Sequence, residues 1–518
     1  MINRESVIVI GAGHNGLVCA AYLARAGKDV TVLEAAEQVG GMAATREFAP
    51  GYRASVPHLL YLLDQDVSRD LLLEDCGLKL AASGLETIAL SEDGGHITIG
   101  PESVEGGGVS EEDKAAYREY RRFMTKFAGI IGELHNQVPP RITQERGDLI
   151  ALGKLALKIR MMGRDDMREF LRIAGINIYD VLKENFENPL LKGALSLDAV
   201  LGTFSGPRSN NSVFTALHRM SGNNAGPAGT ISIPAGGMGA VTEAMAVAAR
   251  KAGAEIRIDS RVSRILMDGT QVCGVELADG KRIEASTVIS NADPKTTIMD
   301  LLGACEVEAG FAQKVTNIRA SGNAAKLHLA LDGLPEFKGL DQDQLGQRLV
   351  IAPSVEYAEH AFNHCKYGEY SQKPVAEITL PSLHDRGLAP DGKHVLSAVV
   401  QYAPRNLGVG WTAGKAEFTD IVLDLISGYA PDIRQKTTAV ELLSPEDIEQ
   451  LFGNQGGHWH HAELALDQFM MLRPVPKSAQ YRTPVDGLYF CSAACHPGGG
   501  VMGSAGKNAA DAVLATEN

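Results

Sequence analysis

The glycines near the start of the chain constrain its fold more than any other feature. Gly11, Gly13 and Gly16 form the pattern G-x-G-x-x-G directly after the apolar residues 6–10 and before a run of small and apolar residues that ends at Gly27. This order predicts a buried parallel strand, a tight turn and a helix. In such a unit the first glycine permits the turn, the second lets a pyrophosphate approach the backbone, and the third lets the helix pack closely on the sheet.

An acidic residue and a second glycine pair follow at informative positions. Glu34 comes at the end of a second predicted strand, residues 29–33, where a carboxylate can accept hydrogen bonds from a ribose. The helix N-terminus offers free N–H groups to a diphosphate. Gly40 and Gly41 favour FAD over NAD, because such a pair commonly lets the chain pass close to the diphosphate and ribityl arm of a flavin nucleotide. The alternative for this pair is a simple turn.

A second G-x-G-x-x-G, at Gly498, Gly500 and Gly503, lies near the C-terminus. Too few residues follow it for another strand and acidic residue, so a second nucleotide site is not expected. We interpret it as the glycine-rich entry to a helix whose positive end faces the flavin and stabilises negative charge on the reduced ring. No separate nicotinamide domain is therefore expected.

The predicted nucleotide-binding segments are separated by two long insertions. Residues 111–188 are charged and helix-periodic, and a second strand-rich block begins near Thr230. We therefore expect an α/β fold, in which a Rossmann-like FAD-binding domain is built from discontinuous segments beside an α+β substrate domain with a helical lid. The expected boundaries are residues 1–85, 230–298 and 455–518 for the FAD-binding domain, and 86–229 and 299–454 for the substrate domain.

Charge and cysteine content narrow the function classes. The net charge of −14 argues against a nucleic-acid binder, since phosphate neutralisation needs a basic face. Seven scattered cysteines without a Cys-x-x-Cys predict neither a disulfide framework nor a redox dithiol. The first predicted strand leaves no room for a signal peptide, and no apolar run is long enough to span a membrane. We expect a cytoplasmic protein.

One segment of the long helical insertion combines basic and apolar residues at helical spacing. It could be a helix that lies on a membrane surface and delivers a lipophilic substrate, which would make the protein peripheral to the membrane. The alternative is a solvated face on a lid helix. The basic residues are Lys154, Lys158, Arg160, Arg164 and Arg168, and the apolar ones are Leu152, Leu155, Ile159 and Met162.

Several segments together resemble a known family. They are GAGHNGL at the N-terminus, IPAGGMGA, VISNADP, GGHWHHAELALDQFMMLRPVP from Gly456 to Pro476, and the tail GLYFCSAACHPGGGVMGSAGKNAADA. These segments resemble the phytoene desaturase-like FAD-dependent oxidoreductases, and most closely the branch called pyridine nucleotide-disulfide oxidoreductase domain-containing protein 2. The resemblance implies an FAD-binding domain of the amine-oxidase type. The tail departs from the family at Ser492, Ala493 and Ala494, where relatives often carry glycine and another small residue.

The resemblance also implies which residues hold FAD. The implied contacts include a backbone contact from Val262 to the adenine and contacts from the tail around the flavin ring. Four neighbours of these residues are added to the expected cofactor site. The expected set is Gly11, Gly13, His14, Asn15, Gly16, Glu34, Gly40, Gly41, Met42, Val262, Asn291, His496, Gly500, Val501 and Met502.

Histidines are the candidates for proton transfer, because they titrate near neutral pH. In an extended segment after Gly457, the side chains of His458 and His460 share one side and that of His461 faces the other. We therefore expect His458 or His460 to line the substrate pocket, and His58 is a third candidate. The alternative is that each histidine only packs or binds a loop. A metal site in this segment is not expected, since no nearby acid or cysteine completes one.

Together these features predict an FAD-dependent dehydrogenase or desaturase that oxidises a C–C or C–N bond of a small, partly apolar substrate by hydride transfer. Electrons would pass to oxygen, a quinone or another carrier. Within the enzymes, the alternatives are an amine oxidase and a redox-neutral isomerase that uses reduced FAD. A non-catalytic binding protein is a third hypothesis, but such a protein would be expected to lose the nucleotide motif, which is intact here.

Overall fold

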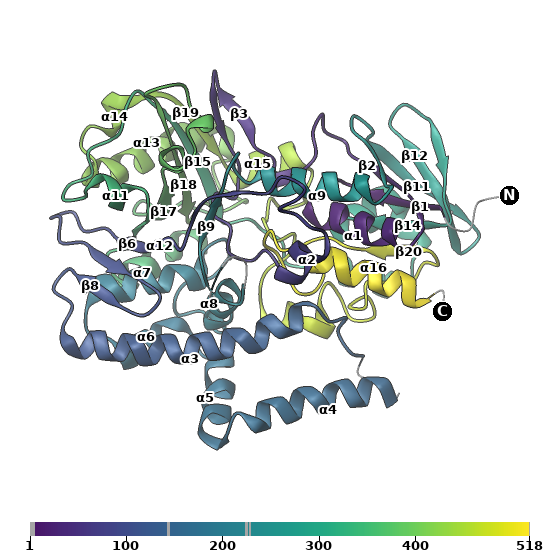
Figure 1. The fold of residues 1–518 in the computed structure, drawn as a ribbon, viewed down its shortest axis with the longest axis horizontal. Helices are drawn as coiled ribbons and strands as arrows, with labels where there is room; N and C mark the ends of the chain where they lie inside the picture. The colour runs from purple at the N-terminus through teal and green to yellow at the C-terminus, as the bar shows by residue number, and fades with distance from the viewer. Residues whose placement is uncertain (1–5, 142–145, 223–225, 227–228, 517–518) are drawn as a thin grey trace.

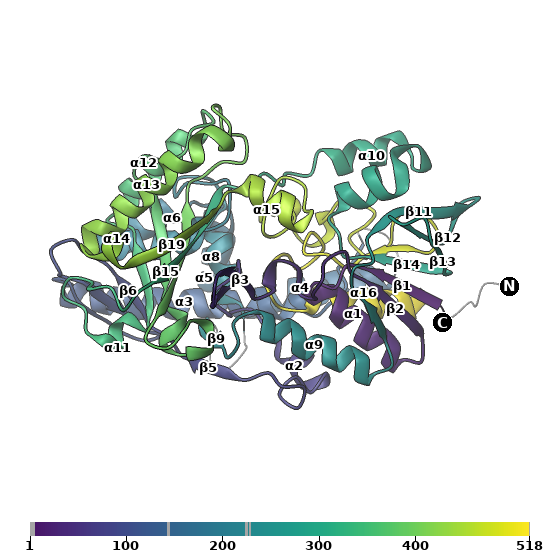
Figure 2. The ribbon, with the colours of Figure 1, turned by 90° about the horizontal axis from the view of Figure 1, so that it is seen from above.

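Two β-sheets stand at opposite ends of the molecule (Figures 1 and 2). The computed structural model describes residues 6–141, 146–222, 226 and 229–516. One sheet is parallel and belongs to an α/β unit, and the other is largely antiparallel and carries most of the remaining helices. This arrangement confirms the predicted α/β fold class with a second α+β part.

The parallel sheet has five strands contributed by segments far apart in the sequence. Their order is β10 (Glu255–Arg257), β2 (Asp29–Leu33), β1 (Ser6–Ile10), β14 (Thr287–Ser290) and β20 (Leu488–Phe490). Three helices pack around this sheet and against one another, namely α1 (His14–Arg25), α9 (Gly239–Lys251) and α16 (Ser504–Thr516).

Small residues bring the helices of this unit into close contact. An added Cβ on Gly16 would lie 2.2 Å from the carbonyl oxygen of Gly11, so only glycine fits between the turn and α1. An added Cβ on Gly506 of α16 would lie 2.1 Å from the carbonyl oxygen of Asn15 in α1. The first and last helices of the described chain therefore meet backbone to backbone, which fixes both to the same end of the sheet.

Smaller β-elements flank the two sheets. An antiparallel sheet of three strands, β11 (Val262–Asp268), β12 (Gln271–Leu277) and β13 (Arg282–Glu284), follows β10. Two antiparallel pairs join β3 (Arg46–Ala49) to β4 (Tyr52–Ala54), which form a hairpin, and β5 (Leu80–Ser83) to the distant β9 (Ser232–Pro234). Shorter helical elements are α2 (Gln65–Asp70), a π-helical segment Thr296–Gly303, α10 (Ala309–Thr316), α11 (Gln342–Leu345), α14 (Ile433–Lys436) and α15 (Pro445–Phe452).

The second sheet has eight strands. Their order is β19 (Thr437–Leu443), β15 (Ala324–Leu331), β18 (His394–Gln401), β17 (Val375–Thr379), β16 (Arg348–Ile351), β6 (Thr87–Ala89), β7 (Ile97–Ile99) and β8 (Val104–Gly106). One face is covered by α13 (Trp411–Tyr429). The helices packed toward the other face are α3 (Glu111–His135), α6 (Ile178–Asn185), α7 (Pro189–Val200), α8 (Ser212–Met220) and α12 (Val355–Cys365).

Alternation along the central strands separates an apolar face from a polar one. In β15, Leu327 and Leu329 join the apolar cluster under α13, so the intervening Lys326 and His328 point to the opposite face. Glu377 of β17 follows the same rule between apolar neighbours. Buried polar side chains therefore gather on the face of the sheet that looks toward the parallel sheet.

Helix α4 (Arg146–Met161) lies at the bottom of Figure 1 and is joined to the helical layer by α5 (Arg164–Gly175), which packs against α3 and α8. Helices α4 and α5 match the predicted helical segment, and Leu149, Ile150, Leu157 and Met161 of α4 are exposed. The side chain of Leu155 lies outside the described residues. Contact of this segment with a membrane surface stays a prediction. No described helix combines the length and apolarity that crossing a bilayer requires.

Candidate active site

A cavity of about 290 Å³ lies between the two sheets. Its walls come from the turn before α1, the loops after β2 and β14, the polar face of the eight-stranded sheet, and the C-terminal glycines. Twelve of the fifteen residues expected to hold a cofactor line it: Gly11, Gly13, His14, Asn15, Glu34, Gly40, Gly41, Met42, Val262, Asn291, Gly500 and Val501.

The glycines at this end of the cavity bring two loops together. Gly13 and Gly40 form an isolated parallel bridge, and the N–H of Gly40 donates to the carbonyl oxygen of Ala12 over 2.8 Å. Gly40 has a φ of +116°, which a side chain would strain. An added Cβ on Gly13 would lie 2.8 Å from Nδ2 of Asn291. The cavity floor is therefore bare backbone, as close approach of a diphosphate requires.

Glu34 ties the glycine turn to the second strand. Its Oε2 accepts a hydrogen bond from the N–H of Ala12 at 2.7 Å, and its Oε1 accepts one from the N–H of Ala36 at 2.9 Å. The carboxylate lines the cavity at the position expected for a ribose contact. It therefore holds the turn in shape and presents its remaining lone pairs to the cavity.

The N-terminus of α1 is equipped to hold FAD. Within the described chain, no side chain caps this end and no acidic residue stands in its first turn. Nε2 of His14 and Oδ1 of Asn15 are buried and have no hydrogen-bond partner among the described residues. Free N–H groups and the positive dipole end suit a diphosphate, and the orphaned polar atoms suit a ligand with hydroxyl groups.

Three of the expected cofactor residues lie outside the cavity wall. Gly16 serves the helix packing described above. His496 is buried and donates from Nε2 to the carbonyl oxygen of Leu134 at 2.7 Å. Burial lowers the pKa of His496 to about 4. The buried Met502 accepts from the N–H of Asp64 through its carbonyl oxygen. His496 and Met502 are therefore packed in the protein interior beside the cavity, and a contact of either with FAD stays a prediction.

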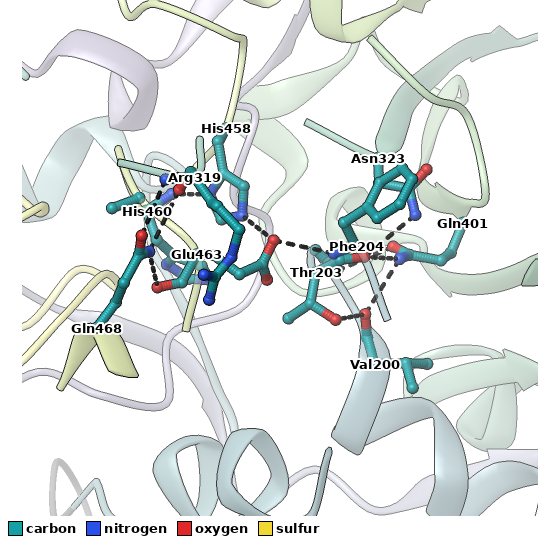
Figure 3. Close-up of polar contacts among 12 residues, drawn as sticks. Val200, Thr203, Phe204, Arg319, Asn323, Gln401, His458, His460, Glu463 and Gln468 are labelled. Carbon is teal, nitrogen blue, oxygen red and sulfur yellow. Dashed lines mark hydrogen bonds and ion pairs between the residues drawn. The ribbon is translucent and has the colours of Figure 1, made fainter. Parts of the chain in front are cut away.

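The histidine segment forms a turn, not the expected extended chain. The N–H of His461 donates to the carbonyl oxygen of His458 at 2.9 Å, and His461 has a φ of +57°. His460 and His461 line the cavity with Trp459, whereas His458 is fully buried outside its wall, with Nε2 3.6 Å from Glu463 Oε2 (Figure 3). The expectation that His458 or His460 lines the cavity agrees with the placement of His460. The expectation that His461 faces away from it is wrong, because a turn breaks the alternation on which it rests.

Arg473 organises this turn and the C-terminal segment together. Its fully buried guanidinium donates to six carbonyl oxygens, including those of His460 at 3.2 Å, Glu463 at 2.8 Å and Ala493 at 2.9 Å. Burial lowers the pKa of Arg473 to about 10. Arg473 is not among the residues predicted from the sequence, because nothing in its neighbours shows that its partners would be backbone carbonyls.

The imidazoles in the cavity wall are neutral bases. Burial lowers the pKa of His14 to about 4, with a further contribution from His461. Burial also lowers the pKa of His460 well below its usual value, and His458 adds to this effect. The pKa of His461 is lowered by burial too, although the nearby Asp293 opposes the shift. Nδ1 of His460 and of His461 is buried and has no hydrogen-bond partner among the described residues.

On the opposite wall His58 stands between a lysine and a carboxylate. Nζ of Lys326 lies 2.8 Å from its Nδ1, and Oε1 of Glu377 lies 3.1 Å from its Nε2. We assign the proton to Nε2, because the amine donates to Nδ1 and the carboxylate accepts from Nε2. Burial, and then Lys326, lowers the pKa of His58 to about 4. His58 therefore lines the cavity as a neutral, fully hydrogen-bonded side chain.

Behind His58 lies a buried network of charges that was not predicted from the sequence. Oε2 of Glu377 accepts from Arg348 Nε at 2.6 Å and from Arg219 Nη2 at 3.0 Å. Both guanidinium groups also contact Asp198. These positions are far apart in sequence and meet only through the sheet. A single charged residue in an otherwise apolar strand, such as Arg348 in β16 and Glu377 in β17, is the sequence signal that could have revealed part of it.

Comparisons with known proteins agree with this site. Pyridine nucleotide-disulfide oxidoreductase domain-containing protein 2 of Rattus norvegicus is 34% identical over 538 aligned residues, which cover 98% of this chain and 93% of the relative. One of the subunits of limonene dehydrogenase from Castellaniella defragrans is 26% identical, and the alignment covers 99% and 95% of the two chains. The solved structure of cyclohexylamine oxidase from Brevibacterium oxydans has a TM-score of 0.58 at 15% identity, with both chains fully covered.

The predicted family resemblance is confirmed by these matches. The profile of a family described as flavin containing amine oxidoreductase matches residues 16–514. This range spans the end of the glycine turn, both sheets and the C-terminal glycines, so the match covers nearly every element of the cavity described above. The chain therefore belongs to the flavin-containing amine oxidoreductase family and is an FAD-dependent oxidoreductase.

Proposed function

We propose that the protein oxidises a C–C or C–N bond of an organic, partly apolar substrate. The chemistry that FAD supplies when bound is acceptance of a hydride. One observation carries the proposal: His460, a neutral base, lies in the cavity wall against the C-terminal glycines. An added Cβ on Gly499 would lie 1.9 Å from Nδ1 of His460, so the imidazole occupies space that only glycine leaves free.

The residues proposed to hold FAD are those of the cavity wall. The turn from Gly11 to Asn15 and the Gly40–Gly41 pair would hold the diphosphate, and Glu34 the ribose. Val262 would contact the adenine, and the glycine-rich entry to α16 would lie at the flavin ring. Gly16, Met502 and His496 are proposed to act through the packing of their segments.

The substrate end of the cavity is largely apolar. Its side chains bind an apolar substrate by excluding water, which also orients the bond that is oxidised. No cysteine stands among the described residues of the cavity wall, and all seven cysteines are unpaired, so oxidation of a dithiol does not fit this site. The apolar residues here include Met42, Val56, Val399, Phe452 and Trp459.

His460 and His461 supply the proton acceptor that such an oxidation needs. An amine must be neutral before a hydride leaves its α-carbon, and C–C desaturation releases a proton from the adjacent carbon. A lowered pKa keeps both imidazoles unprotonated at neutral pH, and Nδ1 of each has no hydrogen-bond partner among the described residues. His58 is proposed to position the opposite wall, since both of its ring nitrogens already have partners.

Two relatives illustrate the two bond types. The name limonene dehydrogenase describes oxidation of a hydrocarbon, and cyclohexylamine oxidase describes oxidation of an amine. Oxygen or a quinone is the proposed electron acceptor. A redox-neutral isomerase would use the same cavity, but it would consume no acceptor.

The test is anaerobic mixing of the FAD-loaded protein with cyclic alkenes and primary amines. We expect one class to bleach the visible flavin band at a saturable rate, and deuteration of the reacting carbon to slow the bleaching. Acceptor consumption in steady state must equal product formed. Conversion of a substrate to its isomer without consumption of oxygen or a quinone would refute the proposal.

Three alanine variants separate a base from a structural histidine. His460→Ala or His461→Ala should lower the bleaching rate per bound FAD by roughly 10²–10⁴-fold, the scale of a lost general base. His360→Ala is the control, because His360 is exposed on α12 and does not line the cavity. Its rate per bound FAD should be unchanged. Losses below tenfold in both His460→Ala and His461→Ala would indicate a structural role for the turn.

A further inference from the structure

A second cavity of about 110 Å³ adjoins the first on the side where α3, α7 and α8 pack against the eight-stranded sheet. The two cavities share Tyr61 and Arg219 in their walls. Arg219 stacks on Tyr61, with its guanidinium carbon 4.3 Å from the ring centroid, and its Nη1 donates to the phenol oxygen at 3.2 Å. These two side chains therefore form the partition between the cavities.

Charges in the wall of the second cavity nearly cancel. Arg348 donates to Oδ1 of Asp198 at 2.5 Å, and Arg219 approaches the same oxygen at 3.3 Å. Both guanidinium groups also bind Glu377, which is buried behind them. Two cations thus neutralise two carboxylates, so these four groups have no net charge. Burial holds the pKa of Lys326, which lies on the far side of His58, well below its usual value. His58, the neighbour of Glu377, is neutral at pH 7, because burial holds its pKa at about 4.

Arg121 adds one positive charge that this network does not balance. It lies on α3, one turn beyond Tyr117, and both residues line the cavity. Its Nε donates to the carbonyl oxygen of Pro101 at 3.1 Å, and its Nη1 contacts the sulfur of Met220 at 3.7 Å. No carboxylate of the described residues forms an ion pair with it. The second cavity therefore has a surplus of one cation at a half-buried position.

We propose that the second cavity binds a carboxylate group between Arg121 and Arg219. A guanidinium suits this ligand, because its fork of donors matches the two oxygens. A singly charged group balances the one surplus cation. A phosphate with two charges fits less well, since Asp198 stands in the same wall. The structure thus points to a monocarboxylate.

The partition also indicates where the rest of the ligand goes. A chain attached to the carboxylate passes Tyr61 and enters the apolar part of the first cavity. This part of the inference rests on the proposed function, and it defines the substrate class as a carboxylic acid that is oxidised at a carbon remote from its acid group. Arg121 would be a specificity-determining residue and would take no part in the chemistry.

The test is calorimetric titration of the FAD-loaded protein with octanoate and with octanamide, which has nearly the same shape and no charge. We expect octanoate to bind at least tenfold more tightly. Arg121→Gln should lower the affinity for octanoate at least tenfold and leave the affinity for octanamide unchanged. Arg118→Gln is the matched control. Arg118 is exposed on the same helix and does not line the cavity, so its loss removes the same charge from the surface only.

Binding of octanoate, but not of acetate, should shift the visible flavin band, because only the longer ligand reaches the first cavity. Equal affinities for octanoate and octanamide would overturn the carboxylate site, and so would equal losses in Arg121→Gln and Arg118→Gln. Tighter binding of octyl phosphate than of octanoate would overturn the choice of anion. Octanoate binding without a shift of the flavin band would show that the ligand does not reach from the second cavity into the first.

The calorimetric result stands apart from the proposed oxidation. If octanoate binds as expected and no carboxylic acid bleaches the flavin, the anion site is retained and the proposed function fails. If neutral alkenes or amines bleach the flavin and octanoate binds no better than octanamide, the proposed function is retained and the anion site fails. FAD content and melting temperature of each variant show whether it is folded.

Discussion

Glu34→Gln is the most informative single change at the cofactor end of the cavity. The carboxylate accepts from two backbone N–H groups, those of Ala12 and Ala36. A glutamine of the same shape has one acceptor oxygen and one amide group that only donates. Whichever way the amide is turned, one of the two N–H groups faces a donor. The variant therefore loses one charge-assisted hydrogen bond and weakens the other.

The magnitude follows from the lost bond. A hydrogen bond to a charged group contributes about 1.5–3 kcal/mol, and each 1.4 kcal/mol is a tenfold change in an equilibrium constant. Both bonds are made within the apoprotein, so the change should lower its free energy of unfolding by about this amount. The carboxylate is also proposed to accept from the ribose of FAD, and loss of its charge should raise the Kd for FAD roughly 10- to 100-fold.

The assay is titration of apoprotein with FAD, followed by quenching of flavin fluorescence. Glu37→Gln is the control, since Glu37 is exposed a few residues further along the same segment. Its Kd should match that of the unaltered protein. A Glu34→Gln variant that binds FAD within twofold of the unaltered protein would refute the assignment of Glu34 to the site.

Three other perturbations test the geometry of the site. Gly499→Ala places a Cβ 1.9 Å from Nδ1 of His460 and should destabilise the protein by about 1–3 kcal/mol. Gly129→Ala on α3 is the control, because an added Cβ there meets no atom within 4 Å. Equal melting temperatures for the two variants would contradict this expectation. His58 is protonated near pH 6.5 in the unfolded chain, whereas the folded chain keeps it neutral down to about pH 4. The stability that this group contributes is therefore complete above pH 6.5. Between pH 6.5 and pH 4 it declines by about 1.4 kcal/mol for each unit by which the pH falls. Urea unfolding of His58→Gln should show a shallower pH dependence, and an unchanged slope would argue against a neutral buried His58. NADH and NADPH should reduce bound FAD poorly, because the only complete dinucleotide-binding pattern in the sequence is the one at Gly11. Rapid, saturable bleaching of the flavin band by either nucleotide would disprove this expectation.

The cofactor end was predictable because its information is local. Gly11, Gly13 and Gly16 impose a turn whose geometry needs no distant partner, and Glu34 follows at a spacing set by one helix and one strand. The segment from His458 to His461 was not predictable in the same way. Its turn depends on Arg473 and on contacts with Glu463, and no pattern within the segment reveals them.

The substrate end was harder still, since its members come from separate strands and helices. Asp198, Arg219, Arg348 and Glu377 meet only when the eight-stranded sheet is assembled. Alternation along each strand predicts which residues share a face, but it does not predict which strands are neighbours. The parallel pairing of β16 with β6 brings residues 348 and 87 together across more than half of the chain. Such pairings are a property of topology, and a single sequence shows them only weakly.

The split of the parallel sheet across the chain has a consequence for biosynthesis. Strand β20 and helix α16 complete the sheet and the wall of the cofactor site, and they leave the ribosome last among the described elements. At about 5–20 residues per second, β14 waits roughly 10–40 s for its neighbour β20 to be translated. During that time the edge of β14 that later pairs with β20 is open, and the backbone of α1 that later meets Gly506 is uncovered. The wall of the proposed FAD site is therefore complete only once α16 has been synthesised, and until β20 arrives this edge of β14 can pair with another strand.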